Sequence, residues 1–411
     1  MTTITHTYSK SGFYEGVVFK LLAEMNQGKL SMNLPGLRTL EIGNGNGVHA
    51  QITVKNPDFF RRCVLYGDVG FGESYVNGDW DSPDITAVIK WFLLNVDKAP
   101  TLSGSRTQPL MLNVLKVVNK ILHFSRANSL RGSKKNISEH YDLSNQFFSL
   151  FLDPSMTYSS AYFKDEGMTL EQAQIAKYER LCSQLKLKAG DSVLEIGSGW
   201  GSNAIYMAKQ YDCKVTTITI SREQFKLATE KVKMEGLAKN VTVLLSDYRH
   251  VKGKYDKIVS VEMLEAVGVE FYETYFSQCN RLLNRNGMLA LQVITCPDSR
   301  FEQLRSGVDW IQKHVFPGSL LPSVGAINSA INKVSDLTLL DLKDIGLHYA
   351  HTLNLWYKAF NQNREEVVKL GFDDLFIRKW NYYLCYCEAA FAMRNINVMQ
   401  MLYARPNNTL R

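Results

Sequence analysis

The chain has 411 residues, which is long for a single hydrophobic core and predicts two domains. Hydrophobic residues make up 45% and charged residues 21%, with no low-complexity tract, so disordered and fibrous proteins are excluded. The net charge of +7 fits an ordinary solvated surface, or attraction to nucleic acid or to anionic phospholipid heads. No basic run with interleaved aromatic residues, no zinc-ligand spacing and no helix-turn-helix pattern occurs, so nucleic acid is the weaker of these two partners.

Hydropathy and cysteine content indicate the cellular compartment of the protein. No apolar run approaches the roughly 18 residues that span a bilayer, and the first ten residues, MTTITHTYSK, lack the apolar core of a signal peptide. The seven cysteines are scattered and odd in number, which favours reduced thiols. We therefore expect a cytoplasmic protein without a metal site.

The first 95 residues are expected to hold an amphipathic N-terminal segment, strands and a helix. Strands are predicted at 37–43, 48–54 and 62–67, followed by YGDVGFGESYVNGDWDSPDITAVIKWFLLN, which is turn-rich and then helical. In LEIGNGNGVHAQI, which begins at Leu40, apolar and polar residues alternate after the turn, so the chain leaves it as a strand. Gly and Asn tolerate positive φ, so we predict a hairpin loop there and no ligand site.

Residues 96–135 are polar and are predicted to form a linker around a helix at about 109–124. From Ile137 onward, strands and helices alternate with short connections. Strands are predicted at 192–197, 214–220, 241–247, 256–262 and 287–294, and helices at 170–186, 201–210, 221–235 and 270–283. This alternation predicts a doubly wound, largely parallel sheet, in which ligands bind at the carboxyl ends of the strands.

A second glycine-rich stretch, LEIGSGWGSNAIY, begins at Leu194 and continues as a helix. A strand, a glycine turn and a helix together direct backbone N–H groups toward a polar ligand. No acidic residue ends the next strand, which closes in TITISREQ, so a dinucleotide is disfavoured. The third strand closes in SDYR, where Asp247 can accept from an amine and Tyr248 can cover a flat ring. The pattern indicates S-adenosylmethionine (SAM); in the alternative interpretation, Asp247 only caps the next turn.

Several uncommon stretches, in this order, resemble the cyclopropane-fatty-acyl-phospholipid synthase family: HYDLSNQFFSLFLDPSMTYSSAYF (140–163), VLEIGSGWG (193–201), TISREQ (219–224), SVEMLEAVG (260–268) and YYLCYCEAAFAMRNI (382–396). GFGESYVNGDWD (70–81) is similar to the smaller N-terminal domain of the longer bacterial members. The resemblance implies a class I SAM-methyltransferase fold, which is α/β, Rossmann-like and doubly wound, with a mostly parallel seven-stranded sheet. It also implies a smaller N-terminal α+β domain for lipid and membrane docking at 1–125 and a catalytic domain at 126–411.

The resemblance and the strand-end pattern together give a set of cofactor-binding candidates. They are Tyr158, Ser159, Val193, Leu194, Glu195, Ile196, Gly197, Ser198, Gly199, Trp200, Gly201, Thr219, Ile220, Ser221, Gln224, Asp247, Tyr248 and Arg249.

Members of this family act on the double bond of unsaturated acyl chains. An alkene is a poor nucleophile, but the sulfonium methyl of SAM is a strong electrophile. When the alkene attacks this methyl, a carbocation is left on the acyl chain. Loss of a proton from the transferred methyl then closes a ring. Such a site must exclude water and must hold a base close to the new methyl. Aromatic faces can stabilise the cation.

The family's base is thought to be a bound bicarbonate. By resemblance, Glu265 and Tyr349 keep the family's residue types and Ile294 offers its backbone, whereas Ser160 replaces a Cys and Gln292 replaces a His. Both replacements can donate a hydrogen bond, so an anion can still bind. The product is therefore open between a cyclopropane ring and a methyl- or methylene-branched chain.

Each catalytic candidate has a structural alternative. In the structural alternative, Glu265 only caps a turn or forms an ion pair. Glu262, one turn earlier, is the rival candidate for the catalytic role. Tyr349 could be a packed core tyrosine. Cys387 matches a cysteine suspected of an active-site role in the family, but the mechanism needs no thiol and a buried Cys usually packs.

We expect a peripheral enzyme on the inner face of the membrane that acts on unsaturated phospholipid acyl chains through a long apolar tunnel. An anionic membrane surface and, by analogy with the family, a second copy in a homodimer are its expected partners. The alternatives are a branching C-methyltransferase, a non-catalytic lipid-binding homologue, and a methyltransferase for small molecules or RNA, which would leave the N-terminal domain unexplained.

Overall fold

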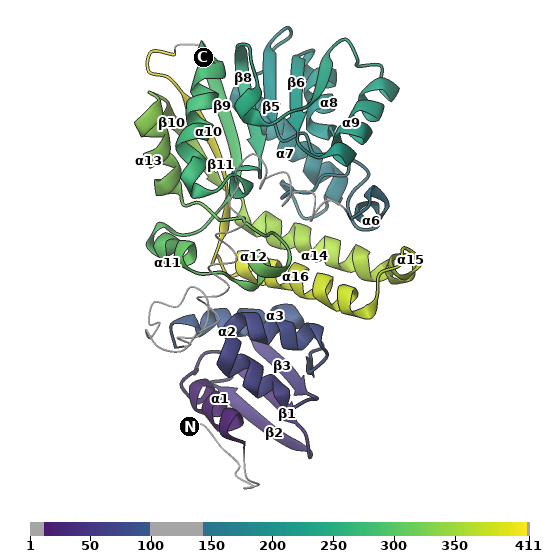
Figure 1. Ribbon diagram of the computed structural model, residues 1–411, viewed down its shortest axis with the longest axis vertical. Helices are drawn as coiled ribbons and strands as arrows, with labels where there is room; N and C mark the ends of the chain where they lie inside the picture. Colours follow the sequence, from purple (N-terminus) through teal and green to yellow (C-terminus); the bar gives the residue numbers. More distant parts are fainter. Residues whose placement is uncertain (1–11, 99–142, 409–411) are drawn as a thin grey trace. The chain divides into compact units, whose positions relative to one another are not determined.

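The computed structural model describes residues 12–98 and 143–408 (Figure 1). The linker helix expected at about 109–124 lies outside these ranges. Among the described residues, unit 1 comprises 12–98, 302–317 and 364–395, and unit 2 comprises 143–301, 318–363 and 396–408.

The compact units are not the two continuous segments 1–125 and 126–411, because unit 1 also includes two later segments of the chain. Helix α16 (Asp374–Ala392) lies in one of them. Its Tyr382 ring stacks on Tyr75 with centroids 5.7 Å apart, and the Thr86 hydroxyl donates to Glu388 at 3.2 Å. The functional division into a docking segment and a catalytic segment stays a prediction.

Unit 1 holds a small sheet with helices. Its elements are α1 (Phe13–Ala23), β1 (Lys29–Leu34), β2 (Arg38–Gly43), β3 (His49–Val54), α2 (Asp58–Val76), β4 (Trp80–Asp81), α3 (Ile85–Leu94), η1 (Val96–Lys98), α12 (Trp310–His314), α15 (Arg364–Lys369) and α16; α11 (Phe301–Ser306) lies in this unit except for its first residue.

The first glycine-rich stretch does join two strands, but the predicted hairpin pairing is wrong. The sheet order is β2-β1-β3-β4, so β1 lies between the two strands (Figure 1). Strand β1 pairs antiparallel with β2 and parallel with β3. The sequence prediction did not include β1, and β1 takes the hydrogen bonds that a hairpin would have formed between its neighbours.

The strand predicted at 62–67 is also wrong, because these residues lie in helix α2. Phe59, Cys63, Gly67 and Phe71 recur every four residues, which is helical spacing, and all four line one cavity. Gly67 has φ 57° and ψ −134° and kinks this helix.

Unit 2 contains the parallel sheet. Its elements are α6 (Asn145–Ser149), α7 (Leu170–Leu185), β5 (Ser192–Ile196), α8 (Ser202–Tyr211), β6 (Lys214–Thr219), α9 (Arg222–Met234), β7 (Val241–Leu245), η2 (Tyr248–His250), β8 (Tyr255–Val261), η3 (Leu264–Ala266), η4 (Val269–Phe271), α10 (Tyr272–Leu282), β9 (Leu283–Thr295), η5 (Asp298–Arg300), α13 (Val324–Val334), β10 (Thr338–Asp344), α14 (Gly346–Gln362) and β11 (Asn397–Ala404).

The strand order is β10-β11-β9-β8-β5-β6-β7 (Figure 1). Strands β5 to β9 are parallel; β11 pairs antiparallel with β9, and β10 pairs antiparallel with β11. The predicted doubly wound, mostly parallel seven-stranded sheet is therefore confirmed. The chain moves outward from β5 on one side and from β8 on the other, so the switch point of the topology lies between these two strands.

Both faces of the central strands β5 and β8 are buried, as is usual in a parallel sheet covered by helices. Val193 packs in a core with residues of α7, α8 and α9. Its neighbour Leu194 packs in a second core with residues of α10 and α13. Because neighbouring strand residues point to opposite faces, Val193 serves one core while Leu194 and Ile196 serve the other.

Helix α7 begins with a capping box. The Thr169 side chain accepts from the Gln172 N–H at 3.2 Å, and the Gln172 side chain accepts from the Thr169 N–H at 2.9 Å. We expect Thr169→Ala to lower the free energy of unfolding of unit 2 by about 1 kcal/mol, a fall of roughly 2–4 °C in Tm by scanning calorimetry. Thr169→Ser keeps the oxygen and should retain the wild-type Tm. An equal fall in both variants would contradict this role of the cap.

Candidate active site

The candidate site lies where β5, β8 and β9 end, on both sides of the switch point. Strand β5 leads into the glycine turn, β8 leads to Glu262 and Glu265, and β9 carries Gln292 and Ile294. Because these strands are parallel neighbours, their carboxyl ends meet at one edge of the sheet.

The glycine turn has the backbone that the sequence predicts. Gly197, Gly199 and Gly201 have φ of 98°, 48° and 90°, in the left-handed region that favours glycine. The N–H groups of Gly197 and Ser198 donate to the Ile218 carbonyl at 3.1 and 2.8 Å, which ties the turn to strand β6. Gly201 is the N-cap of helix α8, and a Cβ added there would lie 3.1 Å from the Ala228 Cβ. This turn at a helix N-terminus fits the polar end of a SAM molecule.

The strand residues before the turn can offer only their backbone to a ligand. Val193, Leu194 and Ile196 are buried in the two hydrophobic cores. The Glu195 carboxylate accepts from Asn203 at 2.8 Å and from the Thr217 hydroxyl at 2.5 Å. Burial raises the pKa of Glu195 to about 7, although these hydrogen bonds oppose the shift. Glu195 therefore links strand β6 to helix α8.

At the end of β6 the predicted residues form a local network that begins helix α9. The Thr219 hydroxyl donates to the Gln224 side chain at 2.8 Å and accepts from the Ser221 N–H at 3.1 Å. The Ser221 hydroxyl caps the helix by accepting from the Gln224 N–H at 3.3 Å. Ile220 lies between Thr219 and this cap. The network fixes the loop that borders the glycine turn.

The Asp247 side chain caps the turn that follows it, as in the alternative interpretation. One of its oxygens accepts from the Arg249 N–H at 2.9 Å and from Arg249 Nε at 2.8 Å, and the other accepts from Arg249 Nη2 at 2.7 Å. The Arg249 guanidinium lies 5.2 Å from the centre of the Tyr248 ring. The buried Tyr248 hydroxyl has no hydrogen-bond partner among the described residues. Of this group, the Tyr248 hydroxyl is the atom that a ligand could satisfy.

Aromatic rings gather beside the turn. Phe148 lies 5.2 Å from both Tyr158 and Trp200, centroid to centroid, and Tyr158 stacks on Trp356 of helix α14 at 5.2 Å. The Trp200 indole donates to Asn145 at 2.7 Å. Such a cluster excludes water and offers π faces to a cation. Trp356 was not among the predicted residues.

Lys177 is a second residue that the sequence prediction missed. Its side chain is fully buried, and its ammonium donates to the Ser159 hydroxyl at 2.7 Å. Burial lowers its pKa to about 8, whereas the charges of Glu262, Asp153 and Glu195 oppose the shift. The available signal was its place at four-residue spacing between the apolar Ala173 and Leu181 of the predicted helix.

Three of the predicted catalytic residues meet at Glu262. Its carboxylate accepts from the Ser160 N–H at 2.9 Å and from the Gln292 amide at 2.8 Å, and it is hydrogen-bonded by the Tyr349 side chain. The Ser160 hydroxyl donates instead to the Ala161 carbonyl at 3.0 Å. Glu262, considered only as a rival of Glu265, is thus the centre of this network. Burial raises its pKa, and its hydrogen bonds and the charge of Lys177 oppose the shift.

Glu265 has a different environment. One carboxyl oxygen accepts from the Ile294 N–H at 2.5 Å, and the other is buried without a partner among the described residues. Burial first, and the charge of Glu262 second, raise the pKa of Glu265 to about 8. At neutral pH Glu265 is therefore protonated, and its second oxygen is available as a hydrogen-bond donor.

The raised pKa of Glu265 predicts how the stability of unit 2 depends on pH. The folded state keeps a proton that an unfolded Glu, with an ordinary pKa of 4.5, has already lost. The contribution of this proton to the free energy of unfolding is fully present below the unfolded pKa. It decreases as the pH rises and is lost above about 8. We expect Tm to fall more steeply for the wild type than for Glu265→Gln, which stays neutral, between pH about 6 and about 9. Parallel curves in scanning fluorimetry would contradict this assignment.

Cys387 belongs to unit 1, on helix α16. Burial and the nearby charge of Asp309 raise the pKa of its thiol, which makes a reactive thiolate unfavourable. Its catalytic role stays a prediction. The described residues hold no cluster of three His, Cys, Asp or Glu side chains suited to a metal ion.

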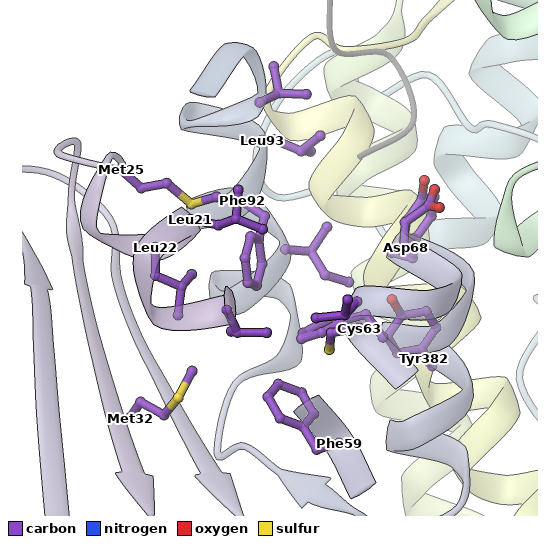
Figure 2. A pocket seen from close by; sticks show the side chains of 17 residues that line it. Leu21, Leu22, Met25, Met32, Phe59, Cys63, Asp68, Phe92, Leu93 and Tyr382 are labelled. Atoms are coloured by element: carbon purple, nitrogen blue, oxygen red, sulfur yellow. The ribbon is translucent and has the colours of Figure 1, made fainter. Parts of the chain in front are cut away.

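Unit 1 contains an apolar cavity of about 100 Å³ (Figure 2). Side chains from α1, β1, α2, α3 and α16 line it, among them Leu22, Phe59 and Phe92. Figure 2 shows Asp68 and Tyr382 together on one side of this cavity. Across residues 12–98 and 143–408, no helix combines the length and apolar character that a membrane-spanning segment needs.

The model of the mycolic acid cyclopropane synthetase family matches residues 128–401. The chain belongs to this family. Cyclopropane-fatty-acyl-phospholipid synthase of Escherichia coli (strain K12) is 39% identical over 360 residues, which cover 87% of this chain and 88% of the relative. Tuberculostearic acid methyltransferase UfaA1 of Mycobacterium tuberculosis is 38% identical over 361 residues, covering 86% and 82%.

A solved structure of the family agrees with the fold. Mycolic acid cyclopropane synthase CmaA1, complexed with SAH (S-adenosylhomocysteine) and CTAB, matches with a TM-score of 0.61 and 32% identity, over 66% of this chain and 97% of that one. The resemblance drawn from the sequence motifs is confirmed, and so is the class I methyltransferase fold. The family member described here is a SAM-dependent methyltransferase that modifies lipids.

Proposed function

We propose that this enzyme transfers a one-carbon unit from SAM to the double bond of unsaturated phospholipid acyl chains, with a cyclopropane ring as the product. The observation that carries the proposal is the buried carboxyl pair Glu262 and Glu265, placed across the switch point from the glycine turn. A carbocation on an acyl chain needs a proton acceptor in a dry site, and these two groups supply one.

SAM supplies an electrophilic methyl group when it is bound. The backbone of Gly197 to Gly201 and the Tyr248 hydroxyl are the groups that would hold it. The rings of Tyr158, Trp200 and Trp356 keep water away from the reacting chain. Neutral Glu265 can donate a hydrogen bond from its unpartnered oxygen, and the hydrogen bonds to Glu262 favour the carboxylate form that proton transfer needs.

Phospholipid is proposed as the substrate on three grounds. The E. coli relative is named as acting on fatty-acyl phospholipid. The net charge of +7 favours an anionic membrane surface, as a peripheral cytoplasmic protein would require. The apolar lining of the cavity in unit 1 suits a hydrocarbon segment, and a longer apolar path for the acyl chain stays part of the proposal.

A methyl- or methylene-branched chain is the second candidate product. The relative named as a tuberculostearic acid methyltransferase shares 38% identity over most of this chain, and Ser160 and Gln292 replace the Cys and His expected from the resemblance. A bound bicarbonate and the Glu262 carboxylate would compete for the same donors, the Ser160 N–H and the Gln292 amide.

The substrate class is tested by transfer of a labelled methyl group from SAM. The full chain is mixed with anionic vesicles of monounsaturated phospholipid, with free monounsaturated fatty acid, or with its acyl thioester. We expect label in the phospholipid acyl chains and none in saturated vesicles. Label confined to free acid or thioester would contradict the phospholipid proposal. Zwitterionic vesicles at equal lipid concentration are the control for surface charge. We expect faster label transfer to the anionic vesicles than to the zwitterionic vesicles at low salt.

A further inference from the structure

Glu262 has a backbone conformation that demands an explanation. Its φ of 48° lies in the left-handed region, which is uncommon for a residue with a Cβ and costs free energy. Strain of this kind persists where the surroundings enforce it, and it concentrates at functional sites. Here the Glu262 N–H donates to the Gln292 carbonyl at 2.7 Å, so the strained residue is fastened to strand β9.

The side chain of Glu262 is held by residues that the resemblance assigns to an anion site. The Ser160 N–H and the Gln292 amide donate to the same carboxylate oxygen, at 2.9 and 2.8 Å, and the Tyr349 side chain adds a further hydrogen bond. The Gln292 amide oxygen accepts in turn from Gln400 at 2.8 Å, which fixes the direction in which the amide donates. The site is thus built around a negative charge that the chain itself provides.

Charge balance supports the same view. Lys177 is the buried cation whose charge acts on Glu262, and Glu265 is the neighbouring acid. The Glu265 environment favours its neutral form, whereas the hydrogen bonds of Glu262 and the charge of Lys177 favour the carboxylate form of Glu262 against the effect of its burial. A further anion bound among the same donors would add a second negative charge to a buried site, which is strongly unfavourable.

We propose that the Glu262 carboxylate is the catalytic base of this enzyme and fills the place of an external anion, so that the reaction needs no bicarbonate. This inference rests on the proposed function. In the step that it explains, the π electrons of the alkene form a bond to the transferred methyl carbon as the sulfur–carbon bond breaks, and the other alkene carbon becomes a cation. Glu262 takes a proton from that methyl, the C–H electron pair closes the ring, and the proton then passes to water.

Two substitutions at one position separate the base from its structural surroundings. Glu262→Gln keeps the size of the side chain and removes the base. Glu262→Gly removes the side chain, opens space among the three donors and suits φ of 48°, so this variant is expected to fold. Glu273→Gln, an exposed carboxylate paired with Lys333, is the matched control.

The rates are measured in buffer freed of carbon dioxide and again with added bicarbonate. We expect the wild type and Glu273→Gln to be equally active in both. Glu262→Gln should lose at least about 100-fold in rate, the lower end of what a placed base contributes, without recovery in bicarbonate. Glu262→Gly should lose as much and recover at least about tenfold in bicarbonate. A wild type that depends on bicarbonate, or a fully active Glu262→Gln, would overturn the proposal.

Anion binding gives a readout that does not depend on turnover. Line broadening of ¹³C-bicarbonate in NMR should be absent with the wild type and present with Glu262→Gly, while both proteins bind SAH. Bicarbonate binding to the wild type at the same strength as to Glu262→Gly would contradict the inference. If the wild type modifies no lipid but shows the expected binding pattern, the proposed function fails and the place of Glu262 in the anion site is still supported.

Discussion

Replacing Gly201 by valine is expected to raise the dissociation constant for SAH by at least about 100-fold. Gly201 has φ of 90°, where a β-branched residue is strained, and a Cβ would meet the Ala228 Cβ at 3.1 Å. Strain of about 1–3 kcal/mol and overpacking of about 1–3 kcal/mol can be relieved if the turn shifts. Ligand binding must then restore the turn, and about 3 kcal/mol corresponds to roughly a 100-fold loss of affinity.

The matched control is Gly190→Val. Gly190 also has a left-handed φ, 82°, but it precedes strand β5 and a Cβ there meets nothing within 4 Å. Titration calorimetry with SAH should give nearly wild-type affinity for this control. Equal losses in both variants would show that strain in the unit, rather than the shape of the glycine turn, determines binding.

Gln292→Leu is expected to reduce both activity and stability. The Gln292 side chain is fully buried; it donates to Glu262 and accepts from Gln400. Leucine leaves the Gln400 amide buried without its acceptor, at a cost of about 1–3 kcal/mol, or a fall in Tm of roughly 5 °C. It also removes one of the donors that hold the Glu262 carboxylate. We therefore expect at least about a tenfold loss of lipid methylation, because a displaced base loses most of its contribution.

The double variant Gln292→Leu with Gln400→Leu separates the two effects. Replacing both partners of a buried hydrogen bond by apolar groups is nearly neutral for stability. The double variant should therefore regain most of the Tm but none of the activity, as measured by scanning calorimetry and label transfer. If activity returned together with Tm, Gln292 would have only a packing role.

The glycine turn shows what the sequence can predict well. The residues after Gly201 recur at helical spacing, and those after Gly43 alternate, so one turn leads to helix α8 and the other to strand β3. Both signals are local, because each depends only on residues within one element. For the same reason the central strands β5 to β9 and the helices between them lie within a few residues of their predicted bounds.

Apart from residues 62–67, which lie in helix α2 and were wrongly predicted as a strand, the errors concern pairing and long-range packing. Nothing local in residues 40–52 indicates that β1 would lie between β2 and β3. Strands β10 and β11 were not predicted, although β11 pairs with β9 along its whole length. Helices α15 and α16 belong to unit 1, although α15 begins 270 residues after α3 ends. Such contacts form only in the folded chain.

The site shows the same division. The resemblance grouped Ser160, Gln292 and Tyr349, and the structure brings them together at one carboxylate, although their catalytic role stays a prediction. It did not reveal that they hold Glu262, since the sequence around Glu262 gives no sign of its positive φ. Lys177 was hidden for a related reason, because a lysine on a helix is ordinarily solvated.

The central claim is tested most directly by the product of the wild-type enzyme. Purified full-length protein is mixed with SAM and anionic vesicles of monounsaturated phospholipid, and the acyl chains are analysed by mass spectrometry and proton NMR. We predict a gain of one CH₂ with high-field ring protons, and the same result without bicarbonate. Methylene or branched-methyl signals would contradict a ring product and support the second candidate product. If the protein binds SAH but the acyl chains gain no mass, the account is contradicted.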